Sequence, residues 1–236
     1  MDWLRVAGVT GLLVIVAACG QPTPTSTRVG LVLHFEAVTA EGAPPTTKQL
    51  EQLRSTLERR LRDAGVGGVV ELEDGGRFIV NTPDVADPEA VRTLVTSTAR
   101  LEFIPMPADR YGSLTAGGPL EPPRPGDPIP KELPALLTGS DLLSVGPSVD
   151  PTTGLSAVEF QLGPGGSRVL ADHTGAHIGE YLAIALDRQA LLVPSISGAI
   201  PDGGMQITVT GGQEETERLV ALLQNGELPF IVREVR

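Results

Sequence analysis

The chain has 236 residues, a formal net charge of −11 and 41% hydrophobic residues. This length and apolar content are enough for a sizeable core. The acidic charge, together with only 3% aromatic residues and no basic stripe, argues against binding to nucleic acid or to anionic lipid headgroups.

Residues 1–18 have the pattern of a secretory signal peptide. Arg5 gives the start a positive charge, and the apolar run at 6–18 is too short to span a bilayer as a helix. The run leads into V-A-A-C, which resembles a bacterial lipobox and contains the only cysteine, Cys19. We expect cleavage before Cys19 and lipidation of its thiol, which would tether the chain to the extracytoplasmic side of the cell membrane. The alternative is an ordinary membrane anchor with an accidental cysteine.

Residues 19–28 are rich in proline, threonine and serine and are expected to form a flexible tether. A regular order of elements follows. The pattern predicts a strand at 29–38, a helix with leucines at three- and four-residue spacing, a hairpin around 73–76, a helix opened by D-P-E at 87–89, and a strand at 101–104. This order, βαββαβ, is typical of a ferredoxin-like unit.

Seven prolines lie between residues 119 and 134. Proline fixes φ and lacks a backbone donor, so we expect a stiff, extended connector at 105–134. A second compact region is expected at 135–200. It should hold strands at 142–149, 155–162, 181–186 and 190–193 and a short helix at 166–176. In the last part of the chain, 201–236, the pattern predicts a strand, a helix at 214–224 and a final strand.

Six short motifs occur in a fixed order along the chain. They read T-A-R-L-E-F at 98–103, L-T-G-S-D-L at 137–142, D-P-T-T-G at 150–154, L-A-I-A-L-D at 182–187, M-Q-I-T at 205–208 and L-L-Q-N-G-E-L-P at 222–229. Together they resemble the first large periplasmic domain of SecD, the membrane subunit that assists protein export. The resemblance covers nearly all of the expected mature chain.

The resemblance implies an α+β fold with two parts. A ferredoxin-like base at 29–104 would be completed by 201–236, and a smaller α+β head would be inserted at 135–200. It also implies that the head holds translocating polypeptide while a proton-driven membrane part moves it. The chain departs from the family where D-L-x-G-G is expected near the first strand. It also offers no intramembrane carboxylate or arginine as a proton relay, so we do not expect it to be a motor by itself.

Few residues suggest chemistry. His173 and His177 are spaced i, i+4 with Glu180 nearby, which could suit zinc, but a third ligand is missing and two solvated histidines are the simpler interpretation. The glycine-rich 163–167 lacks a P-loop lysine, and 195–198 lacks the first glycine of a nucleophile elbow. We therefore assign no catalytic residue, metal or cofactor, and Cys19 is the one predicted modification site.

Two functions from different classes follow. The first is a non-enzymatic, membrane-tethered export accessory whose head binds unfolded or translocating polypeptide or components of the Sec translocase. An exposed sheet edge could provide the binding surface, with the strands at 155–162 and 190–193 as candidates. The second is an envelope binding or sensing lipoprotein that reuses the fold without an export role. A metalloenzyme based on His173 and His177 is the least favoured alternative.

Overall fold

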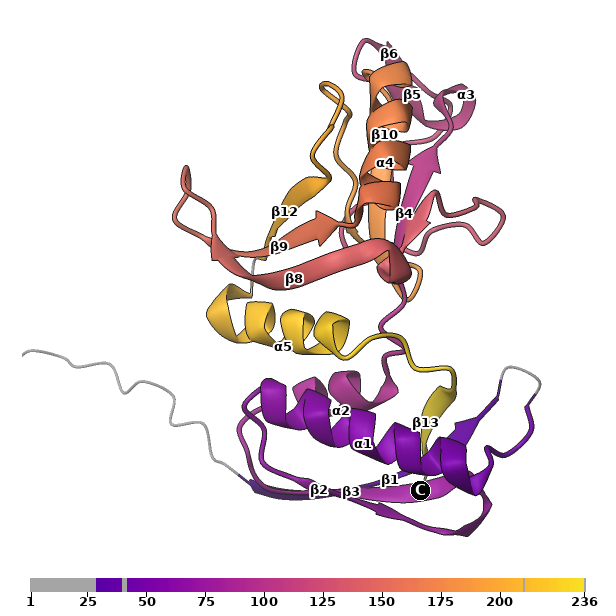
Figure 1. Cartoon of the computed structure of the whole chain (residues 1–236), viewed down its shortest axis with the longest axis vertical. Helices are drawn as coiled ribbons and strands as arrows, with labels where there is room; N and C mark the ends of the chain where they lie inside the picture. The colour runs from indigo at the N-terminus through magenta and orange to yellow at the C-terminus, as the bar shows by residue number, and fades with distance from the viewer. Residues whose placement is uncertain (1–28, 40–41, 210, 236) are drawn as a thin grey trace, which may run out of the picture.

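The computed structural model describes residues 29–39, 42–209 and 211–235 (Figure 1). The fold is α+β with antiparallel sheets, which confirms the predicted class. The predicted signal peptide, Cys19 and the tether lie outside the described residues. Among the described residues, no helix combines the length and the apolar character needed to cross a membrane.

The lower half of the molecule in Figure 1, which we call the base, is one four-stranded antiparallel sheet with helices on one face. The strand order is β13-β1-β3-β2. This is the order of a ferredoxin-like sheet, with β13 as its fourth strand. The elements are β1 (Val29–Val38), α1 (Thr47–Asp63), β2 (Val69–Leu72), the 3₁₀ turn η1 (Asp74–Gly76), β3 (Arg77–Val85), α2 (Pro88–Thr96) and β13 (Ile231–Val235).

Local sequence explains both base helices. The Thr46 side chain accepts from the backbone of Gln49, and the Gln49 side chain accepts from the backbone of Thr46, which forms a capping box for α1. Asp87 caps α2 ahead of Pro88 at the first helical position. The apolar faces of both helices pack on the sheet, where Phe35 and Phe78 stack with ring centroids 5.5 Å apart.

The strand predicted at 101–104 lies elsewhere than expected. It forms β4 (Leu101–Met106), which pairs with β10 (Tyr181–Leu186) and β7 (Leu137–Thr138) in a second sheet. β13 and not β4 is therefore the fourth strand of the base. Five of the six residues of β4 are buried, so the strand needs cover on both faces. The base sheet has helices on one face only, and β13, in which Val232 is buried and Ile231 and Arg233 are exposed, fits that environment.

The upper half, the head, contains two further main sheets. One has the order β11-β10-β4-β7 and the other β12-β9-β8, and all pairings are antiparallel. The remaining elements are α3 (Ala108–Tyr111), β5 (Gly112–Ser113), β6 (Ala116–Gly117), β7 (Leu137–Thr138), the 3₁₀ turn η2 (Gly139–Asp141), β8 (Leu142–Val149), β9 (Ser156–Leu162), α4 (Pro164–Ala176), β10 (Tyr181–Leu186), β11 (Gln189–Leu192) and β12 (Gly204–Thr208).

Residues 105–134 are not the stiff, extended connector between the two halves that their prolines predict. The segment contains α3, β5 and β6, and it then folds along the head. Ile129 and Leu133 are buried against Ala183 and Ala185 of β10. The outer face of the β10–β4 sheet is apolar, and this proline-rich segment covers it.

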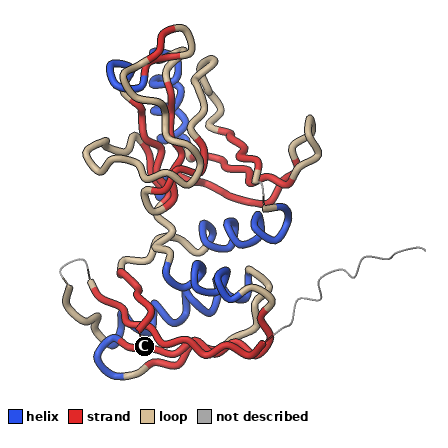
Figure 2. The backbone as a smooth tube through the Cα atoms, turned by 180° about the vertical axis from the view of Figure 1, so that it is seen from behind, coloured by secondary structure: helices blue, strands red, loops and turns tan. Residues whose placement is uncertain are grey.

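The last part of the chain is divided between the halves, whereas we expected all of 201–236 in the base. β12 pairs with β9 in the head, and only β13 joins the base sheet. α5 (Gly212–Gln224) lies between the two halves, as Figures 1 and 2 both show. Leu222 of α5 packs in the base core, while Leu219 and Leu223 pack in the head core, so one helix holds the two halves together.

Candidate functional site

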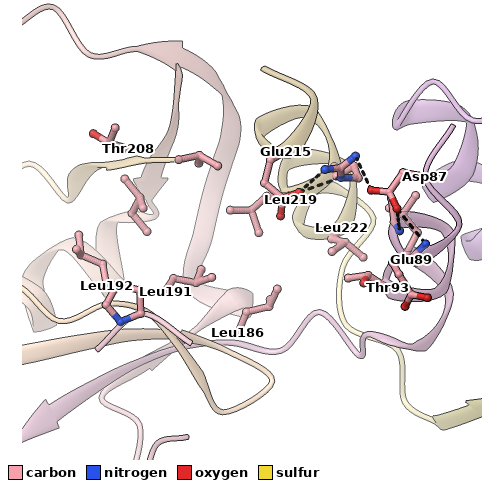
Figure 3. Close-up of a pocket in the computed structure, with 16 residues that line it drawn as sticks. Asp87, Glu89, Thr93, Leu186, Leu191, Leu192, Thr208, Glu215, Leu219 and Leu222 are labelled. Atoms are coloured by element: carbon pink, nitrogen blue, oxygen red, sulfur yellow. Dashed lines mark hydrogen bonds and ion pairs between the residues drawn. The ribbon is translucent and has the colours of Figure 1, made fainter. Parts of the chain in front are cut away.

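A groove of about 540 Å³ lies where α2, α5, β12 and the β10–β11 hairpin meet (Figure 3). This volume is within the range of known ligand sites. Most of the lining is apolar. The apolar lining residues are Ala90, Leu94, Pro125, Leu186, Leu191, Leu192, Ile207, Val209, Leu219 and Leu222.

One wall of the groove is charged. Nη2 of Arg218 on α5 lies 2.5 Å from Oε2 of Glu215. Nη1 of the same guanidinium lies 3.8 Å from Oδ2 of Asp87. Figure 3 labels the two carboxylate residues, Glu215 and Asp87. Asp87 also accepts from the backbone N–H groups of Glu89 and Ala90. The contact therefore joins the N-terminal end of α2 to α5 along one wall of the groove.

An open sheet edge borders the groove. In an antiparallel pair, residues that bond to the partner strand alternate with residues whose backbone groups face away. The N–H of Val209 donates to Ser156, and the N–H of Leu162 donates to the carbonyl of Gly203, so the odd-numbered residues of β12 bond to β9. The residues whose backbone groups face the open edge are Gly204, Gln206 and Thr208.

The opposite edge of the same sheet is blocked. On β8 the N–H of Asp150 donates to Leu155, so its odd-numbered residues face outward. Pro147 at one outward position has no N–H, and the Gln224 side chain donates to the carbonyl of Val145 at another. Proline and covering contacts are common protections of edge strands. β12 lacks both features along its open edge in the described part of the chain.

The edge of β11 is partly covered. The proline-rich segment pairs along it, with Gly126 N–H donating to Ala190 and Ala190 N–H donating to Asp127. Beyond this pairing, Leu191 and Leu192 line the groove. The strand at 190–193, one of our two candidate edges, therefore borders the groove. The other candidate, 155–162, is wrong as an edge because β9 is the central strand of its sheet.

Next to the groove, the chain passes between base and head in two segments, and Arg60 of α1 holds both. Its Nη1 donates to the carbonyls of Leu94 and Ser97, at 3.3 and 2.7 Å. Its Nη2 donates to the carbonyls of Thr98 and Gly226, at 3.4 and 2.8 Å. Burial lowers the pKa of Arg60 to about 10, so it remains charged at neutral pH.

Asp187 holds the same junction from the head. It lies in the β10–β11 turn and accepts from the hydroxyls of Ser97 and Thr98 and from the N–H of Arg100. Among the described residues, the non-glycine residues with positive φ are Ala99, Asp187 and Arg188. All three lie at this junction, where contacts of the surrounding chain hold a conformation that costs free energy in isolation.

Arg188 adds an ion pair inside the head. Its Nε lies 3.3 Å from Oε2 of Glu102, whose side chain is only 8% exposed. The guanidinium also donates to the carbonyl of Leu133 in the proline-rich segment. Arg188 therefore ties this segment to β4.

The predicted chemical residues do not converge. His173 and His177 stack with ring centroids 4.3 Å apart on α4, and Nδ1 of His177 lies 3.2 Å from Glu180. In the described residues, no group of three or more histidine, cysteine, aspartate or glutamate side chains is arranged to hold a metal ion. The glycine-rich stretch at 163–167 leads into α4, where Ser167 bonds back to the carbonyl of Gly163.

Sequence reasoning missed the groove, Arg60 and Asp187. A signal for Arg60 existed, because it follows Leu57 by three residues and so shares the buried face of α1. Asp187 ends the L-A-I-A-L-D motif that carried part of the resemblance. The groove left no local signal, since its walls come from segments that are distant in sequence.

Comparison with known proteins agrees with this architecture. Residues 119–230 match the family described as SecDF, P1 head subdomain. This match includes β12 and α5, in agreement with the pairing of β12 in the head. The protein translocase subunit SecD of Thermobaculum terrenum is 30% identical over 84% of this chain and 49% of its own length. The SecD of Aquifex aeolicus is 32% identical over 78% of this chain and 40% of its own length.

Two solved structures are similar as well. A crystal structure of SecDF in a super-membrane-facing form aligns with a TM-score of 0.67 and 27% identity, covering 89% of this chain and 30% of the other. A structure of a membrane component SecDF that enhances protein export aligns with a TM-score of 0.64 and 28% identity. That alignment covers 87% of this chain and 98% of the other.

In its fold and in these comparisons, the chain is similar to a periplasmic domain of the protein translocase subunits SecD and SecDF. More particularly, the chain is a SecD-like periplasmic domain, which confirms the resemblance found in its motifs. The chain spans about half or less of the length of the curated relatives it matches.

Proposed function

We propose that the chain is a non-catalytic accessory of protein export that binds extended polypeptide along the open edge of β12, with apolar side chains seated in the groove. The main support for this proposal is that an unprotected sheet edge and an apolar groove lie side by side. Addition of a strand to an edge combines main-chain hydrogen bonds, which tolerate many sequences, with pockets for alternate side chains. An export accessory needs this tolerance.

We also propose that Cys19 is lipidated and tethers the domain to the outer side of the cell membrane, close to the translocase. The apolar run, its basic start and the V-A-A-C sequence support this proposal. Metabolic labelling with radioactive palmitate should mark the wild-type chain and leave Cys19→Ser unlabelled. Equal labelling of both chains would contradict the anchor.

Photocrosslinking in cells tests the binding role. A crosslinking residue is placed at Thr208 or Leu192 in the groove, and at Glu71 as the control, because Glu71 lies exposed on β2 of the base. We expect the groove positions to label exported precursors or translocase subunits and the control position to label neither. Labelling of one discrete envelope protein instead would favour a binding lipoprotein without an export role.

Blocking the edge provides a second test. Thr208→Pro removes an N–H that faces the open edge and leaves the bonds of β12 to β9 intact. The matched control is Val149→Pro at an outward position of β8, on the opposite edge of the same sheet. We expect Thr208→Pro to abolish peptide binding and Val149→Pro to retain it. Equal binding by both variants would rule out strand addition at β12.

A further inference from the structure

The groove is apolar on one side and acidic on the other. Its apolar side is formed by the β10–β11 hairpin and β12, and its acidic side by the N-terminal turns of α2 and α5. The acidic lining residues are Asp87, Glu89 and Glu215, and among the described residues of the lining Arg218 is the one cation.

The cation is already neutralised. Glu215 binds the guanidinium of Arg218 through both Nε and Nη2, at 3.0 and 2.5 Å, and Asp87 lies behind it. Glu89 pairs with Arg92, which also pairs with Glu234. The groove wall and its ion-pair partners therefore hold four carboxylates and two guanidinium groups, a net charge of −2.

The two helix ends reduce this charge without reversing it. The N-terminus of a helix carries about half a positive charge. The two helices together thus offset about one of the two excess negative charges. Glu89 is the most exposed of the carboxylates that line the groove, since 81% of its side chain is exposed.

We infer that the groove prefers polypeptide segments in which apolar residues stand next to lysine or arginine. This inference rests on the proposed function and adds a preference to it. The apolar side chains would lie on Leu191, Leu192 and Ile207, while the basic side chain would reach the carboxylates of Asp87 and Glu89. A segment with glutamate at the basic position would meet like charges there.

Fluorescence anisotropy with synthetic peptides tests the preference. The probes are short extended peptides that alternate valine and threonine and carry lysine, glutamine or glutamate at the same positions. At low salt we expect the purified chain to bind the lysine peptide about fivefold more tightly than the glutamine peptide, since exposed ion pairs contribute modestly. The glutamate peptide should bind most weakly, and added salt should narrow the differences.

The variant Asp87→Asn/Glu89→Gln tests whether these two carboxylates cause the preference for the lysine peptide. Asparagine caps a helix as well as aspartate, so α2 should remain intact. We expect the variant to bind all three peptides alike, with the affinity of the wild-type chain for the glutamine peptide. The control Glu71→Gln, which removes an exposed carboxylate of the base, should keep the preference.

The possible outcomes separate the two proposals. Equal binding of all three peptides by the wild-type chain would overturn the inference and leave polypeptide binding standing. Binding of none of the peptides would overturn polypeptide binding itself. A preference for lysine that persists in the double variant would also contradict the assignment to Asp87 and Glu89.

Discussion

The carboxylate of Asp187 accepts a hydrogen bond of 2.6 Å from the hydroxyl of Ser97. Asp187 lies in a hairpin turn of the head, and Ser97 follows the last helical residue of α2 in the base. The pair therefore joins the two halves of the molecule directly. Arg60 of the base supports this contact, because its guanidinium donates to the carbonyl of Ser97 and attracts the carboxylate of Asp187.

Replacing Asp187 with asparagine should destabilise the junction. Asparagine tolerates the positive φ of this position but lacks the charge that strengthens the hydrogen bonds from Ser97, Thr98 and Arg100. We expect the free energy of unfolding to fall by about 1.5 kcal/mol in urea titrations. Asp202→Asn, in an exposed turn, should change it little. An unchanged stability of Asp187→Asn would show that the contact is not stabilising.

Arg60→Met should be more damaging. The substitution leaves the carbonyls that Arg60 binds without their donor inside the junction. We expect a loss of about 3 kcal/mol in the free energy of unfolding, measured by chemical denaturation. The control is Arg62→Met, because Arg62 is exposed in the same turn of α1. Similar losses in both variants would mean that helix propensity, and not the junction, is responsible.

The ion pair of Glu102 and Arg188 can be tested by a double-mutant cycle. Arg188→Met leaves the buried carboxylate of Glu102 without the cation beside it, which should cost about 3 kcal/mol of unfolding free energy. Adding Glu102→Gln removes the unpaired charge, so the double variant should be more stable than Arg188→Met alone. Strictly additive losses would show that the two side chains are not coupled.

Mild acid should destabilise the head through His173. Burial, and then the neighbouring His177, lower the pKa of His173 below its ordinary value of 6.5. The unfolded chain therefore binds the proton more readily than the folded chain, and stability is lost as the pH falls below about 6.5. The effect should be small because His173 is only partly buried. Thermal melts between pH 7.5 and about 5.5 should show a weaker pH dependence for His173→Gln than for the wild-type chain.

The control for this measurement is His34→Gln, since His34 lies exposed on β1 of the base. Its melts should follow the wild-type pH dependence. If His34→Gln flattens the profile and His173→Gln leaves it unchanged, the assignment to the stacked pair on α4 is wrong.

Local patterns in the sequence determined much of the fold. The leucine spacing and the Thr46–Gln49 capping box specify α1, and the D-P-E sequence at 87–89 specifies the start of α2. The ordered motifs indicated a SecD-like domain. These features depend on neighbours in the chain, so their physical causes can be read directly from the sequence.

Tertiary structure decided which sheet each strand joins. β4 is buried on both faces, so it pairs inside the head, while the half-exposed β13 completes the base. The same long-range packing placed the proline-rich segment on the head and brought β12, the β10–β11 hairpin, α2 and α5 together around the groove. Strand pairing and burial depend on partners that are distant in sequence, and periodicity within one segment does not identify those partners.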